Sequence, residues 1–492
     1  MRKLSGGISS DAIMLLVVKL VTTALGLVIT RLLSEYLSVY DYGSYSQILL
    51  VVSTVSSVTV LGMMDGVNYF YCREQDPQRR ESYVATAFAL QSTLGTAGGC
   101  IVMALSTPLC LYFENPGIRT LLIFAAALPV LQNLMGMFQI LLVSVGKAGL
   151  LAVRNLVVSV LRLAVVLVVV TVARDVWIIL LATVLLDIGQ IAVFWIILRK
   201  NNCYVRLTKV KWRLLGEILH YCAPMAVFTV INTLNRDLDK YVISLWTDTE
   251  TLAMYANASK PLPFDILMTS FCTVLIPHIT RQIAVGDKKQ AALLYKVFLE
   301  IAYMSTAVLC GAALAAAPQL MKLLYSNKYT DGLLIFCIYI LVDLLRFTNI
   351  TLVLSAAGKT RRLMALGFGT LALNGVLNVV AYHAIGILGP AIATLLVTVI
   401  TGILMLYFSA EVLETKLVRF FDWKYLWLFV TESALLTIAL SAFRRMLELW
   451  DVHYFLILII IAGLYGIVML LLNGRRLLDA LHNVNHHAPN GQ

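Results

Sequence analysis

A polar stretch in an otherwise apolar sequence, residues 231–260, contains the side chains best suited to chemistry. Five of them recur at spacings that place them on one face of a helix: Asn232, Asn235, Arg236, Asp239 and Lys240. A charged side chain at the centre of a bilayer costs about 2.5–3.5 kcal/mol. Such a face must therefore contact water or pack against other parts of the protein. It either binds something polar or locks helices together.

The elements that must position these residues are membrane-spanning helices. Of the 492 residues, 60% are hydrophobic and only 13% are charged, and no stretch is polar enough for a separate soluble domain. Apolar runs of about 20 residues, the length that crosses a hydrocarbon core, recur throughout. We predict an all-α integral membrane protein with about fourteen transmembrane helices, at 11–33, 44–66, 83–112, 119–144, 149–173, 176–198, 216–245, 252–280, 293–316, 332–357, 363–384, 388–410, 425–443 and 454–473.

The basic residues predict how the chain is oriented. The first apolar segment contains Lys19 and is not followed by a small-residue cleavage site, so we expect a retained helix instead of a signal peptide. Most other Lys and Arg fall in alternate loops, around 2–3, 73–80, 147, 199–213, 281–289, 359–362, 416–424 and 475–476. By the positive-inside rule both termini are predicted to be cytoplasmic. The same rule accounts for the net charge of +11 without a nucleic-acid partner.

An internal repeat divides the chain. Tyr45 and Tyr255 end similar blocks 210 residues apart, and Lys147 and Lys359 end Gly-Lys connections 212 residues apart. Six predicted helices separate equivalent positions, so the halves have the same orientation, a parallel repeat around an axis along the membrane normal. We predict two six-helix lobes around a central cavity and two extra C-terminal helices: 1–198 (helices one to six), 199–213 (basic cytoplasmic linker), 214–411 (helices seven to twelve) and 412–492 (the last two helices and a cytoplasmic tail).

Several blocks resemble a known family. They are RLLSEY with DYGSY in 31–45, NRDLDKY with YANASK in 235–260, Pro277, and NGVLNVV with GILGPAIAT in 374–394. With these blocks the chain resembles the Wzx-type oligosaccharide flippases of the multidrug/oligosaccharidyl-lipid/polysaccharide (MOP) flippase superfamily. The resemblance covers nearly the whole chain. It implies alternating access and movement of a polyprenyl-diphosphate-linked glycan from the inner to the outer leaflet, for polysaccharide biosynthesis at the bacterial inner membrane.

The implied substrate suggests roles for the intramembrane polar residues. Cations would meet the diphosphate, and amides would meet sugar hydroxyls. The substrate-binding candidates are Lys19, Arg31, Asn232, Asn235, Arg236, Lys240 and Lys260. Two readings stay open, because Lys19 and Arg31 could instead snorkel to an interface. Arg236 and Lys240 could equally form a structural ion-pair cluster with Asp239.

Other intramembrane charges are expected to pair or to couple transport to an ion. Arg162 with Asp187, and Asp343 with Arg346, are predicted structural ion pairs. Asp239 and Asp265 are candidates for Na⁺ or H⁺ coupling. The membrane potential alone could also drive an outward-moving anion, at about 2.3 kcal/mol per charge per 100 mV.

Enzymatic chemistry has little support in the sequence. It contains no Walker, GxSxG, HExxH or paired-histidine metal motif, and its eight cysteines are dispersed without CxxC spacing. We expect no catalytic residue, no metal and no cofactor. The expected partners are the lipid-linked oligosaccharide, membrane lipid and a polysaccharide polymerase acting beside a monomeric flippase.

Three alternatives remain. A multidrug or cation antiporter of the same superfamily would need a more acidic cavity. Lipid II flippases usually carry arginines in the middle of the first helix, where this chain has Lys19, Thr22 and Thr23, although its helix count resembles theirs. A membrane glycan polymerase or glycosyltransferase would normally present a sizeable extracytoplasmic loop, whereas the outer loops here are short.

Overall fold

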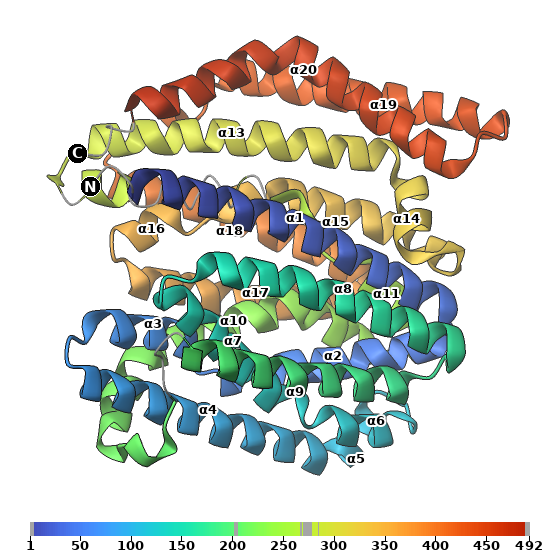
Figure 1. Cartoon of the computed structure of the whole chain (residues 1–492). Helices are drawn as coiled ribbons and strands as arrows, with labels where there is room; N and C mark the ends of the chain where they lie inside the picture. The colour runs from blue at the N-terminus through green and yellow to red at the C-terminus, as the bar shows by residue number, and fades with distance from the viewer. Residues whose placement is uncertain (1–3, 201–204, 266–267, 269–277, 284, 488–492) are drawn as a thin grey trace. The chain divides into compact units, whose positions relative to one another are not determined.

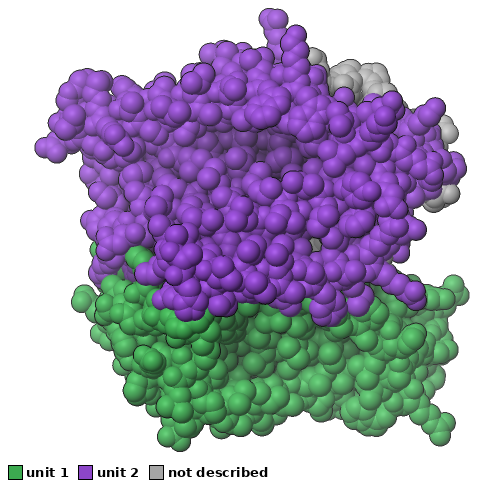
Figure 2. All heavy atoms as spheres, turned by 180° about the vertical axis from the view of Figure 1, so that it is seen from behind, with its two compact units in different colours: residues 1–254 green, residues 255–492 purple. Residues whose placement is uncertain are grey.

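A computed structural model describes residues 4–200, 205–265, 268, 278–283 and 285–487 (Figure 1). These residues form helices joined by short connections, and no strand occurs among them. Contacts divide the chain into two compact units, residues 1–254 and 255–492 (Figure 2).

The first unit is built from ten helices and two short 3-10 turns within the described residues. In chain order they are α1 (Leu4–Tyr36), α2 (Val39–Thr59), α3 (Met63–Arg73), α4 (Pro77–Ala104), α5 (Ser106–Tyr112), α6 (Ile118–Ala125), α7 (Leu128–Ser144), α8 (Ala148–Val172), α9 (Val176–Lys200), η1 (Leu207–Lys209), η2 (Trp212–Leu214) and α10 (Leu215–Ser244). Helix α11 (Thr249–Ala258) crosses the boundary between the units.

The second unit continues with long helices and short turns. Its described elements are η3 (Pro263–Asp265), α13 (Lys288–Ala315), α14 (Ala317–Tyr325), η4 (Asn327–Gly332), α15 (Leu333–Leu345), η5 (Arg346–Asn349), α16 (Leu352–Ala356), α17 (Thr360–Ile385), α18 (Leu388–Val412), η6 (Leu417–Phe420), α19 (Trp423–Leu449) and α20 (Tyr454–His487).

The predicted all-α membrane fold is confirmed. Within the described residues, 12 helices are long and apolar enough to cross a membrane. They match twelve of the fourteen predicted spans. The predicted span 44–66 is divided between α2 and α3, because the chain turns at Leu61 and Gly62, which both have positive φ. Within the predicted span 252–280, residues 266–267 and 269–277, which include Pro277, lie outside the described residues.

Small residues allow helices of the first unit to approach closely. A Cβ on Gly95 of α4 would lie 2.5 Å from the Cα of Val130 in α7. A Cβ on Gly99, one turn on, would lie 2.2 Å from the carbonyl oxygen of Ala126. Helix association in membranes depends on such close backbone contact, because lipid is as apolar as the side chains. The pair therefore fixes α4 against α7.

The last two helices pack within the second unit. Helices α19 and α20, which have no counterpart in the predicted repeat, lie beside α13 (Figure 1). Arg476 of α20 joins all three segments, since its guanidinium contacts Glu300 of α13 at 2.6 Å and Asp422 at the start of α19 at 2.9 Å. A polar contact between three helices is the kind of link that stabilises association where lipid gives little hydrophobic drive.

The two units differ from the predicted lobes. Helix α10, which begins the predicted second lobe 214–411, packs against α2 and α3 and belongs to the first unit. The lobe boundaries follow the sequence repeat, whereas the units follow contacts in one conformation. The lobes therefore stay a prediction.

Candidate functional site

The polar face of residues 232–240 lies in the C-terminal half of α10. This helix spans Leu215–Ser244, so Lys240 is four residues from its end and Asn232 is twelve. At 1.5 Å per residue, the polar face extends from roughly 6 to 18 Å from that end. The helix agrees with the predicted span 216–245 to within one residue at each end, and the polar face lies nearer its C-terminal end than its middle.

The buried residue Asp237 contacts both cations of this face. The carboxylate of Asp237 accepts hydrogen bonds from Arg236 Nη2 at 2.9 Å and from Lys240 Nζ at 2.8 Å. The Asp237 side chain is 6% exposed, whereas that of Arg236 is 52% exposed. The sequence indicated Asp239 as the partner of Arg236. In the structure Asp237 forms this ion pair, because the long arginine side chain reaches its sequence neighbour.

Helices α2 and α5 hold the end of α10 in place. Tyr241 exchanges a hydrogen bond of 2.6 Å with Thr54 Oγ1 in α2, and its backbone carbonyl accepts one of 2.6 Å from Tyr112 in α5. Ser53 Oγ of α2 also donates to Asp237 at 3.4 Å. The charged face is thus fixed on one side by neutral hydroxyl groups.

The remaining candidates of the first unit have distinct environments. Arg31 forms an ion pair of 2.8 Å with Glu35, one turn along α1. Lys19 and Asn232 are exposed, and Asn235 is half-buried. Helix α1 packs mainly on α8, whereas α10 packs on α2 and α3. Whether Lys19 faces the α10 cations across water stays a prediction.

The second unit holds two further candidates. Lys260 is exposed and follows the end of α11, where its backbone N–H donates to the carbonyl of Asn257 at 3.3 Å. Pro261 and Pro263 then end the helix, as expected from their missing N–H groups. The side chain of Asp265 lies outside the described part of the chain, so its coupling role stays a prediction.

Both predicted ion pairs, Arg162 with Asp187 and Asp343 with Arg346, are present in the structure. Arg162 Nη2 of α8 lies 3.2 Å from Asp187 Oδ1 of α9. Gln190 donates to the same carboxylate oxygen at 2.8 Å. Arg154, which was not among the predicted residues, hydrogen-bonds Gln190, and its guanidinium carbon lies 4.3 Å from the ring centroid of Phe194. Together these residues connect α8 with α9.

The second predicted pair has an additional partner. Arg346 Nε lies 3.1 Å from Asp343 Oδ1 in the last turn of α15. The other oxygen of Asp343 accepts a hydrogen bond of 3.0 Å from the backbone N–H of Leu262. This buried carboxylate therefore anchors the chain directly after Lys260.

The arrangement suits reversible binding of an anion. Arg236 and Lys240 provide two cations, and Asp237 with Asp239 provides two anions, so the four charges sum to zero. Charged hydrogen bonds of this kind can be exchanged for a bidentate anion without leaving a cation unpaired. Among the residues searched, no group of three or more His, Cys, Asp or Glu could hold a metal ion.

The fold is shared with known transporters and flippases. The chain is similar to the lipid II flippase MurJ in an inward closed conformation, with 15% identity over 95% of this chain and 100% of that chain and a TM-score of 0.71. The MATE multidrug transporter DinF-BH aligns with 13% identity, 83% and 96% coverage and a TM-score of 0.60. A MOP superfamily transporter from Pyrococcus furiosus aligns with 13% identity, 82% and 94% coverage and a TM-score of 0.57.

These likenesses define the class as a multi-pass membrane protein with the MOP superfamily fold. Residues 28–333 match the family described as polysaccharide biosynthesis protein, and the chain belongs to that family. It is thus a multi-pass membrane protein of a polysaccharide biosynthesis family, and the fold expected from the predicted superfamily is confirmed. No curated protein sequence matches the chain.

Proposed function

We propose that this protein moves a polyprenyl-diphosphate-linked oligosaccharide from the inner to the outer leaflet of the bacterial inner membrane by alternating access. Both termini would then be cytoplasmic, and a polymerase would use the flipped product. The observation that carries the proposal is the pairing of Arg236 and Lys240 with one buried acid in a chain of a polysaccharide biosynthesis family.

The ion pairs suggest how a diphosphate would be accepted. In the described conformation both cations contact Asp237, so neither is held in a low-dielectric region without a counter-charge. A diphosphate could take over these hydrogen bonds as it enters, and Asp237 could recover them as it leaves. Such an exchange keeps both cations paired with an anion at each stage. Lys19 and Lys260 would add positive charge, and Asn232 and Asn235 would hydrogen-bond sugar hydroxyls.

The driving force follows from the charge of the cargo. A diphosphate carries about two negative charges, and each gains about 2.3 kcal/mol per 100 mV on moving outward. The membrane potential would therefore suffice without a cofactor. Coupling to Na⁺ or H⁺ at Asp239 or Asp265 is the alternative, and dependence of transport on either ion at zero potential would support it.

A lipid II flippase is the second candidate, favoured by the 95% coverage in the comparison with MurJ. Similarity to a MATE multidrug transporter makes a cation antiporter the third candidate. The transported substrate distinguishes the three candidates. A lipid II flippase would be needed for peptidoglycan, whereas the proposed protein would be needed for a surface polysaccharide. An antiporter would export a cationic dye, and it would be needed for neither.

Deletion in a strain without a redundant flippase tests the proposal. The lipid-linked repeat unit should then accumulate on the cytoplasmic leaflet and the surface glycan should disappear. Complementation with Arg236→Ala or Lys260→Ala should restore roughly a tenth or less of the glycan, because each removes a charged hydrogen-bonding group worth about 1.5–3 kcal/mol. Arg445→Ala, an exposed arginine of α19, is the matched control and should restore it fully. Normal surface glycan in the deletion strain would contradict the proposal.

A further inference from the structure

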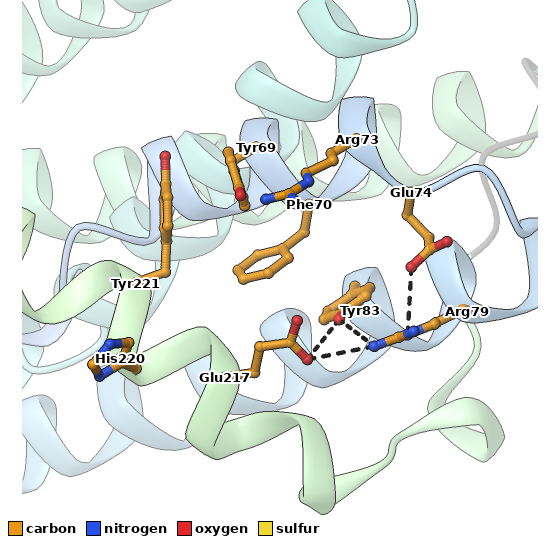
Figure 3. Close-up of a pocket in the computed structure, with 9 residues that line it drawn as sticks. All are labelled: Tyr69, Phe70, Arg73, Glu74, Arg79, Tyr83, Glu217, His220 and Tyr221. Atoms are coloured by element: carbon orange, nitrogen blue, oxygen red, sulfur yellow. Dashed lines mark hydrogen bonds and ion pairs between the residues drawn. The ribbon is translucent and has the colours of Figure 1, made fainter.

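A half-open pocket lies in the first unit where α3, α4 and α10 meet (Figure 3). Its volume of about 480 Å³ falls within the range of small-molecule sites, about 300–1,000 Å³. Each of the three helices contributes two lining residues one turn apart: Tyr69 and Arg73, Arg79 and Tyr83, and Glu217 and Tyr221. Residues at this spacing share a helix face, so three faces converge on one space.

Stacked aromatic rings form the walls of this pocket. Tyr69 of α3 stacks on Tyr221 of α10 with ring centroids 4.1 Å apart. Phe70 stacks on Tyr83 of α4 at 4.6 Å and meets the edge of Tyr221 at 5.6 Å. Phe70 is buried, whereas Tyr221 is 36% exposed. Aromatic rings from all three helices thus form the wall of the pocket, and Tyr221 is its partly exposed ring.

The charged groups of the pocket neutralise one another. Arg79 lies 3.3 Å from Glu74 and 3.6 Å from Glu217 (Figure 3). Tyr83 donates a hydrogen bond of 2.7 Å to Glu217. Arg73 lies over the ring of Tyr69, with its guanidinium carbon 5.3 Å from the centroid. Two arginines and two glutamates leave the lining of the pocket with no net formal charge.

Close contact between α3 and α10 makes the pocket preformed. A Cβ on Gly66 of α3 would lie 2.3 Å from Sγ of Cys222, the residue after Tyr221. The ion pair and hydrogen bond between α4 and Glu217 fix the other side of α10. A site whose walls are already ordered loses little conformational entropy when a ligand binds.

We propose that this pocket binds a neutral sugar ring. The C–H face of a pyranose would stack on Tyr221, and its hydroxyls would exchange hydrogen bonds with Glu217 and Arg73. The inference rests on the proposed function in one respect, because the sugar would belong to the glycan of the lipid-linked substrate. The positive-inside rule places this end of the helices on the cytoplasmic side, where the glycan would wait before transport. A free cytoplasmic sugar has the same chemistry.

Binding can be measured on the purified full-length protein in nanodiscs. The probes are the methyl glycosides of a hexose, an N-acetylhexosamine and a deoxyhexose, observed by saturation-transfer NMR. Wild-type protein should transfer saturation to the ring protons of at least one glycoside. Tyr221→Ala should weaken that binding about tenfold, since it removes the aromatic contact. Glu217→Gln should weaken it to a similar degree.

Two further variants control for folding and for unspecific contact. Tyr221→Phe keeps the ring and should keep binding, so a loss seen only in Tyr221→Ala reports stacking. Tyr407→Ala removes a tyrosine that is 57% exposed in the second unit and should leave binding unchanged. Transfer to none of the glycosides, equal binding by Tyr221→Ala, or displacement of the glycoside by inorganic phosphate would overturn the proposal.

Surface glycan in cells distinguishes the two sources of the sugar. Loss of sugar binding together with reduced surface glycan in Tyr221→Ala assigns the pocket to the lipid-linked substrate. Loss of sugar binding with normal surface glycan assigns it to a free sugar. A failed binding experiment combined with accumulation of the lipid-linked unit in the deletion strain refutes the pocket alone, and the proposed flippase function stands.

Discussion

At the scale of single residues, the hydrogen bonds to Asp237 determine what the cations of α10 can do. Its carboxylate is buried and contacts Arg236 and Lys240, and Ser53 of α2 adds a third donor. Removing one partner of a buried ion pair leaves an uncompensated charge, which is more costly than never having built the pair. The acid therefore stabilises the empty site and competes with an incoming anion.

A double-mutant cycle on Asp237→Asn and Lys240→Gln tests this pairing. Asp237→Asn should lower the free energy of unfolding by about 1.5–3 kcal/mol, the value of a charged hydrogen bond. The double variant should lose less than the sum of the single losses, because one contact is removed twice. Thermal unfolding of the detergent-solubilised protein gives the energies.

The matched cycle combines Asp237→Asn with Lys288→Gln. Lys288 contacts Glu414 in the second unit, so the two losses should add. Additive losses in the Asp237 and Lys240 cycle would show that the two side chains do not interact.

At the scale of helices, the approach of α3 to α10 depends on a glycine. Gly62 precedes α3 with a φ of +62°, and a Cβ there would lie 2.8 Å from Cβ of Met225 and 2.9 Å from the backbone nitrogen of Ala226. An L-residue in this left-handed region costs about 1–2 kcal/mol, and the contact with α10 adds to that cost. Gly62 therefore lets α10 lie close enough to complete the pocket.

Gly62→Ala and Gly146→Ala separate these two costs. Gly146 also has a positive φ, +78°, but a Cβ there would meet nothing within 4 Å. Gly146→Ala should cost about 1–2 kcal/mol of unfolding free energy, and Gly62→Ala should cost more. Chemical denaturation in mixed micelles can compare them. Equal losses would mean that the contact between α3 and α10 is not tight.

The junction of α19 and α20 predicts a pH dependence. The hydrogen bond from Arg476 lowers the pKa of Asp422 below its usual value. A carboxylate with a lowered pKa in the folded protein stabilises it above the unfolded pKa, near 3.9, and this contribution is lost as the pH falls through the folded value. Asp422→Asn should therefore lower the melting temperature at neutral pH by a small amount, and the difference from wild type should shrink in acid.

Asp248→Asn is the control for the Asp422 variant. Asp248 is exposed and accepts a hydrogen bond of 2.8 Å from the backbone N–H of Thr251, so it also caps a helix. Its variant removes a capping charge without touching α20. A difference from wild type that stays constant for Asp422→Asn between neutral and acid pH would contradict the role of the ion pair.

At the scale of the whole molecule, the sequence predicted the features that depend on the length of apolar segments and on contacts between residues close in sequence. Twelve spans could be predicted because an apolar segment that crosses a bilayer must form a helix to satisfy its backbone hydrogen bonds. Arg162 with Asp187, and Asp343 with Arg346, could be paired because a membrane leaves a charge few partners. These contacts are local in sequence or join consecutive helices.

What the sequence missed depends on side-chain reach and on distant segments. Asp237 precedes Lys240 by three residues, but Arg236 and Asp239 have the same spacing, so the sequence alone does not distinguish the two pairs. The aromatic pocket joins Tyr83 to Glu217, 134 residues apart. No periodicity relates these positions, because a bend at Gly62 and the linker before α10 bring them together.

Transport by purified protein in liposomes tests the central claim most directly. The lipid-linked oligosaccharide is placed in the inner leaflet, a glycosidase is added outside, and an inside-negative potential is applied. The account predicts that wild-type protein makes the glycan accessible to the glycosidase, and that Arg236→Ala slows this about tenfold or more. An equal rate in liposomes without protein, or in wild type and Arg236→Ala, would contradict it.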